Sequence, residues 1–204
     1  MLTEQLNVAK LRLLDLDDHS HRLFQPYSGS APVRALVIFS KLGDQPELRV
    51  IAGGLILAGM LMDSDRLVRA GARMLLAHEA AALIKSVFKT NIDRTRPRSA
   101  TSRNDKKPKQ GNSSAKEQSS FPSGHSAGAI AAARAASREY PEYGAALTTA
   151  AAVVATSRVL RCAHYPTDVI AGLLLGLAVE AGANAVWDGL NMDRRSSIEA
   201  RIAE

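Results

Sequence analysis

The chain of 204 residues contains one cysteine, Cys162, which excludes an internal disulfide framework. Nothing around this thiol marks it as activated, so we expect a small buried side chain. Aromatic residues make up only 4% of the sequence, although 46% of it is hydrophobic. Runs of β-branched residues with alternating polarity are scarce, which disfavours a sheet protein. The opening 18 residues mix leucines with charges and lack the apolar core of a cleavable signal.

Alanine is abundant instead, above all in residues 127–155. Alanine is the best helix former, and its small side chain lets neighbouring backbones approach closely. The length suits one domain with a real core. The sequence therefore predicts an all-α fold, a bundle of about five to six helices. The expected helices cover residues 3–17, 33–41, 50–62, 66–88, 123–138, 143–160 and 166–190.

The domain organisation follows from shifts in polarity along the chain. Residues 1–32 form a polar N-terminal segment with a short helix, and residues 33–190 form the helical domain. Residues 99–120 are rich in Ser, Lys, Asn and Gly, which predicts an insert too hydrophilic to pack, a mobile loop. Residues 191–204 are expected to form a polar, solvated helical tail.

Long hydrophobic runs are also missing, which leaves the relation to a membrane open. A helix that spans a bilayer needs roughly 20 mostly apolar residues. The uncharged runs here, residues 50–62, 143–157 and 169–179, are shorter. Gly172 and Gly176 form a GxxxG pair suited to tight helix contact in lipid, although such spacing also occurs in soluble helices. A soluble bundle and a thin membrane bundle both fit this pattern.

The formal net charge is +6, and much of the excess lies between residues 89 and 116. A basic cluster attracts nucleic acid, anionic lipid or a small phosphorylated substrate. Composition alone does not choose among these partners.

Three separate segments carry residues suited to phosphate. In the first, Lys89 ends a predicted helix and Arg96 follows seven residues later, held by Pro97. The guanidinium fork of arginine matches phosphate oxygens, while lysine acts as a point charge. Taken alone, the segment favours the plain alternative of a solvated basic helix end.

The second segment, residues 121–125, leads directly into the alanine-rich helix. Ser123 is a preferred N-cap residue, and Gly124 lets a ligand approach the backbone. The free N–H groups and the positive end of the helix dipole form an anion site, with His125 in the first turn. The plain alternative is a capped helix with a surface histidine.

The third segment runs from Ser157 to Asp168. Pro166 suits the first position of a new helix, which places Asp168 in its first turn. From there Asp168 can accept a hydrogen bond from one ring nitrogen of His164. The other ring nitrogen then becomes an aimed nucleophile, as in catalytic triads. A favourable carboxylate at a helix start is the plain alternative.

Together the three segments specify eleven positions in order, which is improbable by chance. The combination Lys89-x6-Arg96-Pro97, Pro122-Ser123-Gly124-His125 and Ser157-Arg158-x5-His164-x3-Asp168 resembles the signature of the type 2 phosphatidic acid phosphatase (PAP2) superfamily. The resemblance covers about residues 85–170 and is greatest to the bacterial lipid-phosphatase branch. Two features depart from that branch: the usual first transmembrane helix is missing or reduced to residues 33–41, and the insert is unusually polar.

The resemblance implies roles for the residues of the three segments. His164 is the nucleophile that becomes a phosphohistidine, Asp168 orients it, and His125 protonates the leaving oxygen. The phosphate is held by Lys89, Arg96, Ser123, Gly124 and Arg158. We expect the active site at one end of the bundle. No cofactor or metal is expected, because three cations already neutralise the phosphate and the sequence shows no acidic cluster suited to magnesium.

The expected activity is hydrolysis of a phosphomonoester or diphosphate, most naturally of a lipid, in or close to a bacterial-type cell membrane. The alternative is that the protein is soluble and acts on a small phosphorylated molecule. Nucleic acid is not an expected partner. Two other functions stay open: a vanadate-dependent haloperoxidase-like enzyme, and a non-catalytic binder of anionic lipid or nucleic acid. The substrate, the orientation, the role of the insert and the oligomeric state are not determined by the sequence.

Overall fold

The computed structural model describes residues 2–102, 104–113 and 115–202. These residues contain seven α-helices and one antiparallel pair of two-residue strands, so the predicted all-α class is confirmed. The helices are α1 (Leu2–Phe24), α2 (Ala31–Ser40), α3 (Gln45–Leu61), α4 (Asp65–Lys89), α5 (Gly124–Glu139), α6 (Gly144–Leu160) and α7 (Pro166–Ile202). The strands are β1 (Ile92–Asp93) and β2 (Lys109–Gln110).

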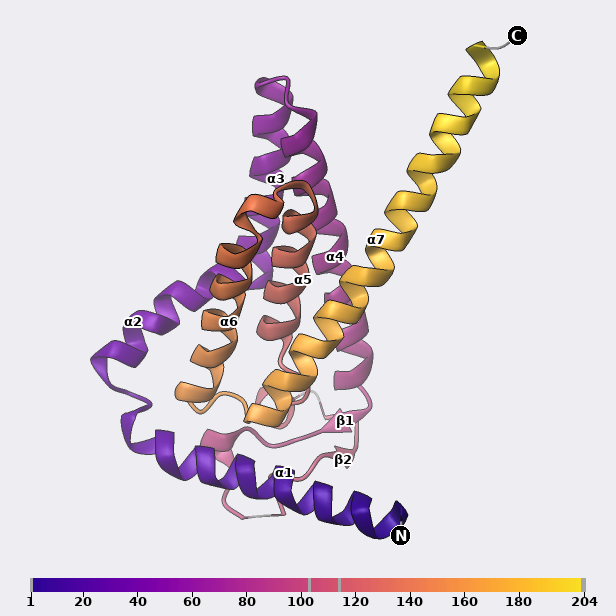
Figure 1. Ribbon diagram of the computed structural model, residues 1–204. Helices are drawn as coiled ribbons and strands as arrows, with labels where there is room; N and C mark the ends of the chain where they lie inside the picture. The colour runs from indigo at the N-terminus through magenta and orange to yellow at the C-terminus, as the bar shows by residue number, and fades with distance from the viewer. Residues whose placement is uncertain (1, 103, 114, 203–204) are drawn as a thin grey trace.

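Helix α5 forms the centre of a bundle made by α3 to α7 (Figure 1). It packs against α4, α6 and α7, and α3 covers the other side of α4. Most of α5 is buried, and its buried residues are mainly alanines. Because alanine loses little side-chain entropy on burial, an alanine-rich helix suits a position enclosed by three neighbours.

The glycine pair of α7 lies where this helix crosses α5. A side-chain carbon at Gly172 would collide with the carbonyl oxygen of Ser123, and one at Gly176 with that of Ala127. The two glycines therefore let the backbones of α5 and α7 touch, as GxxxG pairs do between membrane helices.

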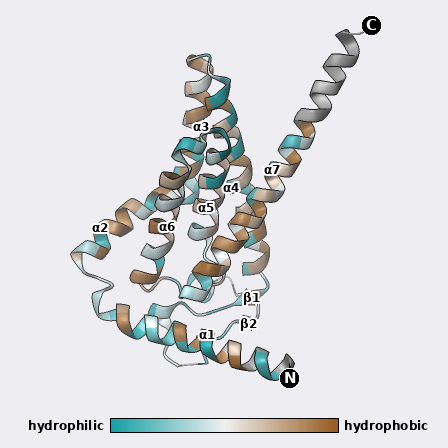
Figure 2. Cartoon of the chain, viewed as in Figure 1, coloured by the Kyte–Doolittle hydropathy of each residue, from teal (hydrophilic) through white to brown (hydrophobic). Residues whose placement is uncertain are grey.

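Many large apolar side chains of the bundle are exposed, and Figure 2 shows hydrophobic residues along its helices. Two segments, Pro141–Leu160 and Pro166–Leu190, are long and apolar enough to cross a membrane, and only 28% of each apolar window is buried. A core helix of a soluble protein would be mostly buried. The most exposed large apolar residues on α3, α4 and α7 are Val50, Leu57, Met60, Leu61, Leu83, Val87, Leu174, Val186 and Leu190.

Helices α1 and α2 lie outside the bundle. Helix α1 is longer than the predicted 3–17 and runs across the end of the bundle where α7 begins (Figure 1). The predicted polar tail continues α7 as far as Ile202, and residues 203–204 lie outside the described part of the chain.

The insert at residues 99–120 was expected to be too hydrophilic to pack, and this part of the prediction is wrong. Lys106 forms an ion pair with Asp18 of α1 at 2.6 Å, and Ser120 is fully buried. Strand β2 of the insert pairs with β1 just before it. Polar partners, rather than apolar burial, hold the segment against the end of the bundle. Its residues 103 and 114 lie outside the described part, and its mobility stays a prediction.

Candidate active site

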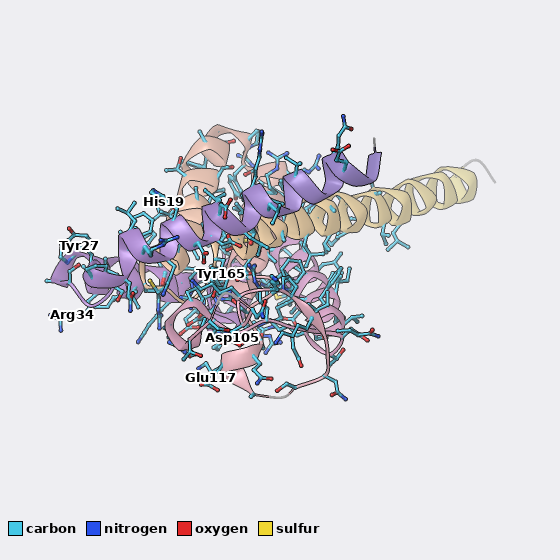
Figure 3. All side chains as sticks on the ribbon, turned by 90° about the horizontal axis from the view of Figure 1, so that it is seen from below. His19, Tyr27, Arg34, Asp105, Glu117 and Tyr165 are labelled. Carbon is cyan, nitrogen blue, oxygen red and sulfur yellow. The ribbon has the colours of Figure 1, made fainter. Side chains whose placement is uncertain are left out.

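The residues of the three sequence segments meet at one end of the bundle. Helix α4 ends there at Lys89, α5 begins there after Ser123, α6 ends there beyond Arg158, and α7 begins there at Pro166 (Figure 1). The Ser123 N–H donates to the carbonyl oxygen of Asp168 at 3.0 Å, which ties the start of α5 to the start of α7. Seen from this end, α1 crosses the face that holds Tyr165 (Figure 3).

Three cations are held mainly by neutral oxygen atoms. Lys89 Nζ donates to the carbonyl of Ser119 at 3.0 Å, and Arg96 Nε donates to the carbonyl of Lys116 at 2.8 Å. Arg158 donates from Nη1 to the hydroxyl of Ser40 at 3.3 Å, while its buried Nε finds no acceptor among the described residues. Burial, and next the charge of Arg96, lower the pKa of Lys89 to about 8. Positive charge with so little compensation favours a bound anion.

The start of α5 supplies part of the predicted phosphate cradle. The hydroxyl of Ser123 caps the helix by accepting from the Ser126 N–H at 3.4 Å. The Ser123 N–H is already used by the Asp168 carbonyl, so it is not free for a ligand as expected. The Gly124 N–H has no acceptor in the described residues and remains available. The anion site of this helix therefore begins one residue later than predicted.

His164 is buried and held by a hydrogen bond that the sequence did not indicate. Its Nδ1 lies 2.7 Å from the carbonyl oxygen of Ser120 but 3.8 Å from Asp168 Oδ2. Because a carbonyl only accepts, Nδ1 carries the proton, and Nε2 keeps its lone pair. The orienting acceptor is thus Ser120, while Asp168 adds negative charge nearby.

The environment keeps His164 neutral at physiological pH. Burial lowers the pKa of His164 to about 4, although the Asp168 carboxylate acts in the opposite direction. At neutral pH the imidazole is therefore uncharged, which is the state that a nucleophile requires.

His125 has an acidic partner that was not predicted. Its Nε2 contacts the carboxylate of Asp44, the N-cap residue of α3. Burial, and next the charges of Arg158 and His164, lower the pKa of His125 to about 2, so these groups favour the neutral ring. The charges of Arg158 and His164 both act on this ring, which lies at the same end of the bundle as the other site residues.

Arg94 is the largest omission from the predicted site. It is buried and donates from Nη1 to Asp168 Oδ1 and from Nη2 to Asp17 Oδ2, each at 2.5 Å. Its Nη1 also donates to the Thr167 hydroxyl at 2.7 Å, and its guanidinium lies 4.2 Å from the centre of the Tyr165 ring. Arg94 therefore connects the catalytic carboxylate candidate with helix α1.

The remaining contacts of Asp168 complete this network. Oδ2 accepts hydrogen bonds from the Ser120 hydroxyl at 2.5 Å and from the Tyr165 N–H at 3.0 Å. Every oxygen of this buried carboxylate is thus satisfied, as a charged group in the interior requires. Within the described residues, no group of three histidine, cysteine or acidic side chains could hold a metal ion.

A comparison with protein families gives a match over most of the bundle. The family model of the PAP2 superfamily matches residues 70–190, more than half of the chain. No curated protein sequence matches the chain significantly.

Two solved structures share the fold. One is the crystal structure of Aquifex aeolicus LpxE, with 20% identity and a TM-score of 0.61, covering 81% of this chain and 92% of that chain. The other is described as the first transmembrane PAP2 type phosphatidylglycerolphosphate phosphatase from Bacillus subtilis. It has 22% identity and a TM-score of 0.61, and covers 90% of this chain and 88% of that chain.

Proposed function

Since this chain belongs to the PAP2 superfamily and is a phosphatase, we propose that it hydrolyses a lipid phosphate or diphosphate through a phosphohistidine on His164. The observation that carries the mechanism is the state of His164: it is buried, neutral and fixed through Nδ1 by the Ser120 carbonyl. Its free Nε2 belongs to the same end of the bundle as Lys89, Arg96 and Arg158.

In the first step, His164 Nε2 attacks phosphorus, and the bond from phosphorus to the leaving oxygen breaks. Lys89, Arg96 and Arg158 hold the phosphoryl oxygens, with the Gly124 N–H as a further donor. The phosphorylated ring is a cation, and the Asp168 carboxylate stabilises it. His125 donates its proton to the leaving oxygen. The charge of the bound phosphate and the Asp44 carboxylate both favour the protonated form of His125 that this step consumes.

In the second step, neutral His125 accepts a proton from water as the water oxygen attacks phosphorus. The bond from His164 Nε2 to phosphorus breaks, and inorganic phosphate leaves. The proton taken from water returns His125 to its acid form, so the cycle closes without a further reactant.

A lipid substrate is supported by the outer surface of the bundle. Two segments are apolar enough to cross a membrane, and exposed large apolar side chains lie on α3, α4 and α7. The end of α6 and the start of α7 bring the site to the level where these helices would leave the hydrocarbon region. A lipid headgroup would reach the three cations at this level, while its chains remain among the exposed apolar residues. We therefore also propose that the protein resides in a membrane.

The mechanism is tested by mixing the purified protein with a ³²P-labelled alkyl phosphate and quenching within milliseconds at alkaline pH. We expect acid-labile, base-stable label on the wild type, and none on His164→Ala, together with a loss of turnover of several orders of magnitude. His19→Ala, which removes an exposed histidine of α1, is the matched control. Full turnover by His164→Ala would refute the assignment. Bromide oxidation with added vanadate and peroxide would instead support haloperoxidase chemistry.

A second experiment tests the substrate class and the location. Cells that produce the protein are fractionated, and phosphate release is measured with a panel of lipid phosphates and a soluble ester. We expect activity in the membrane fraction and a preference for lipid phosphates. Activity in the soluble fraction with the soluble ester alone would contradict both proposals.

A further inference from the structure

A cationic groove lies between helix α2 and the segments that carry Arg98 and Arg161. Its volume is ≈470 Å³, and its lining includes the side chains of Arg34, Lys41, Arg98 and Arg161, with Val37 and Ile38. The lining contains no acidic residue. In the view onto the site end of the bundle, Arg34 lies near the outer edge (Figure 3).

The positive charge of the groove is not neutralised by ion pairs. Among the described residues, none of the four cations has a carboxylate within ion-pair distance. Burial, and next the charge of Arg98, lower the pKa of Arg161, so these two guanidinium groups repel each other. A cleft lined by charge of one sign concentrates the opposite charge, and a bound anion would relieve the repulsion.

Two arginines of the groove are close in sequence to two arginines of the candidate site. Arg98 follows Arg96 by two residues, and its N–H donates to the carbonyl of Cys162 at 3.2 Å. Arg161 lies one helical turn beyond Arg158 at the end of α6. The backbone that positions two phosphate-binding arginines therefore also positions the groove.

The groove lies beside the acidic partner of His125, because the Asp44 N–H donates to the carbonyl of the lining residue Lys41 at 2.8 Å. Asp44, the partner of His125, interacts electrostatically with Arg158, Arg161 and Lys41. Since His125 donates its proton to the leaving oxygen, the group attached to that oxygen extends towards these cations. Ile38 is 68% exposed at the outer side, so the groove also offers apolar contact.

We propose that Arg34, Lys41, Arg98 and Arg161 form a second anion subsite, which selects amphiphilic substrates whose leaving group keeps a negative charge. This inference rests on the proposed function and narrows its substrate class. The fitting chemistry is a lipid diphosphate, or a phosphomonoester beside a phosphodiester. With a diphosphate, the bond broken joins the terminal phosphorus to the bridging oxygen. The lipid monophosphate leaves with the proton of His125, and water then releases inorganic phosphate.

The test compares two synthetic substrates with the same alkyl chain, one a diphosphate and the other a monophosphate. The variant Arg34→Gln/Lys41→Gln removes two groove charges that lie outside the three sequence segments. The matched control Arg12→Gln/Lys109→Gln removes two exposed charges elsewhere. We expect the ratio of kcat/KM for diphosphate over monophosphate to fall by about tenfold or more in the groove variant, the loss expected for one charge-assisted hydrogen bond. The control should keep the wild-type ratio.

A ratio within twofold of the wild type in the groove variant would overturn the subsite. The same holds if that variant loses only binding to vesicles of anionic lipid, which would make the groove a membrane contact. Binding is measured separately on His164→Ala by calorimetry, with an alkyl methylenediphosphonate and an alkyl phosphonate. Tighter binding of the diphosphonate, lost in the groove variant, supports the subsite even if the phosphohistidine mechanism fails. Equal binding of the two ligands would overturn the subsite even if the mechanism holds.

Discussion

Replacing Arg94 with methionine removes a buried cation while keeping a side chain of similar length. In the wild type, Arg94 bonds to Asp17 and Asp168 at 2.5 Å each, and both carboxylates are almost fully buried. Loss of one partner of a buried ion pair costs about 3–5 kcal/mol, because the remaining charge is left uncompensated. Here two carboxylates lose the same cation, so we expect at least this cost.

The expected cost is a large part of the total stability, which for a typical domain is about 5–15 kcal/mol. For a chain of this size, 1 kcal/mol corresponds to roughly 2–4 °C in Tm. Arg94→Met should therefore lower Tm by about 6–20 °C. The variant Arg22→Met, which changes an exposed arginine of α1, should stay within about 2 °C of the wild type.

Kinetics of the same variant show whether Arg94 also positions Asp168 for catalysis or only stabilises the fold. Arg94 touches Asp168 but none of the residues that hold the phosphate. We expect kcat to fall by about tenfold or more at a temperature where the variant is folded, with KM changed much less. Arg94→Lys keeps the positive charge but lacks the guanidinium group that bonds to both carboxylates. It should therefore recover part of the lost kcat.

A double-mutant cycle with Asp17→Asn completes the test. Asp17→Asn leaves one carboxylate for one arginine, so it should destabilise less than Arg94→Met. The two changes together should cost about 1–3 kcal/mol less than the sum of their separate effects. Thermal unfolding in detergent and steady-state kinetics check both parts. Additive effects, or an Arg94→Met protein with wild-type Tm and kcat, would refute the reasoning.

Three further predictions follow from the site and the bundle. Because the pKa of His164 is lowered to about 4, its neutral form persists below the usual histidine range. The acid limb of kcat/KM, corrected for ionisation of the substrate, should lie near pH 4, and a limb at the ordinary value of 6.5 would contradict this. Activity should survive excess chelator, since three cations neutralise the phosphate. If a chelator titration abolishes activity and added metal restores it, the three cations do not suffice to neutralise the phosphate. Gly172→Ala places a methyl group against the Ser123 carbonyl and should destabilise by about 1–3 kcal/mol, whereas Gly182→Ala, with open space around it, should not, as Tm will show.

Local signals explain why much of the fold could be predicted. Pro166 begins α7 and Ser123 caps α5 as expected, because both preferences act within one helical turn. Glycine, proline and aspartate residues mark the beginnings and ends of other helices in the same way. A helix was expected at 33–41, and α2 lies there with a length of ten residues.

Residues with non-local partners could not be predicted in the same way. Ser120 is one of many serines in a polar insert, and only the fold brings its carbonyl to His164. Asp44 lies in the turn before α3, and its contact with His125 depends on how α3 packs near α5. Arg94 lies inside the first motif, where no local pattern distinguishes it from its basic neighbours. A buried arginine is recognised by its two carboxylates, which are 77 and 74 residues away.

The direction in which each helix runs determines on which side of a bilayer the two ends of the chain would lie relative to the catalytic residues. Helices α3 to α7 traverse the bundle an odd number of times, starting at the site end, whereas α1 lies across that end (Figure 1). In a bilayer, an epitope tag attached ahead of α1 would therefore share a compartment with the catalytic residues. A tag attached beyond α7 would face the opposite compartment. Protease protection of the two tags would thus assign the compartment in which phosphate is released, without altering any residue that handles it.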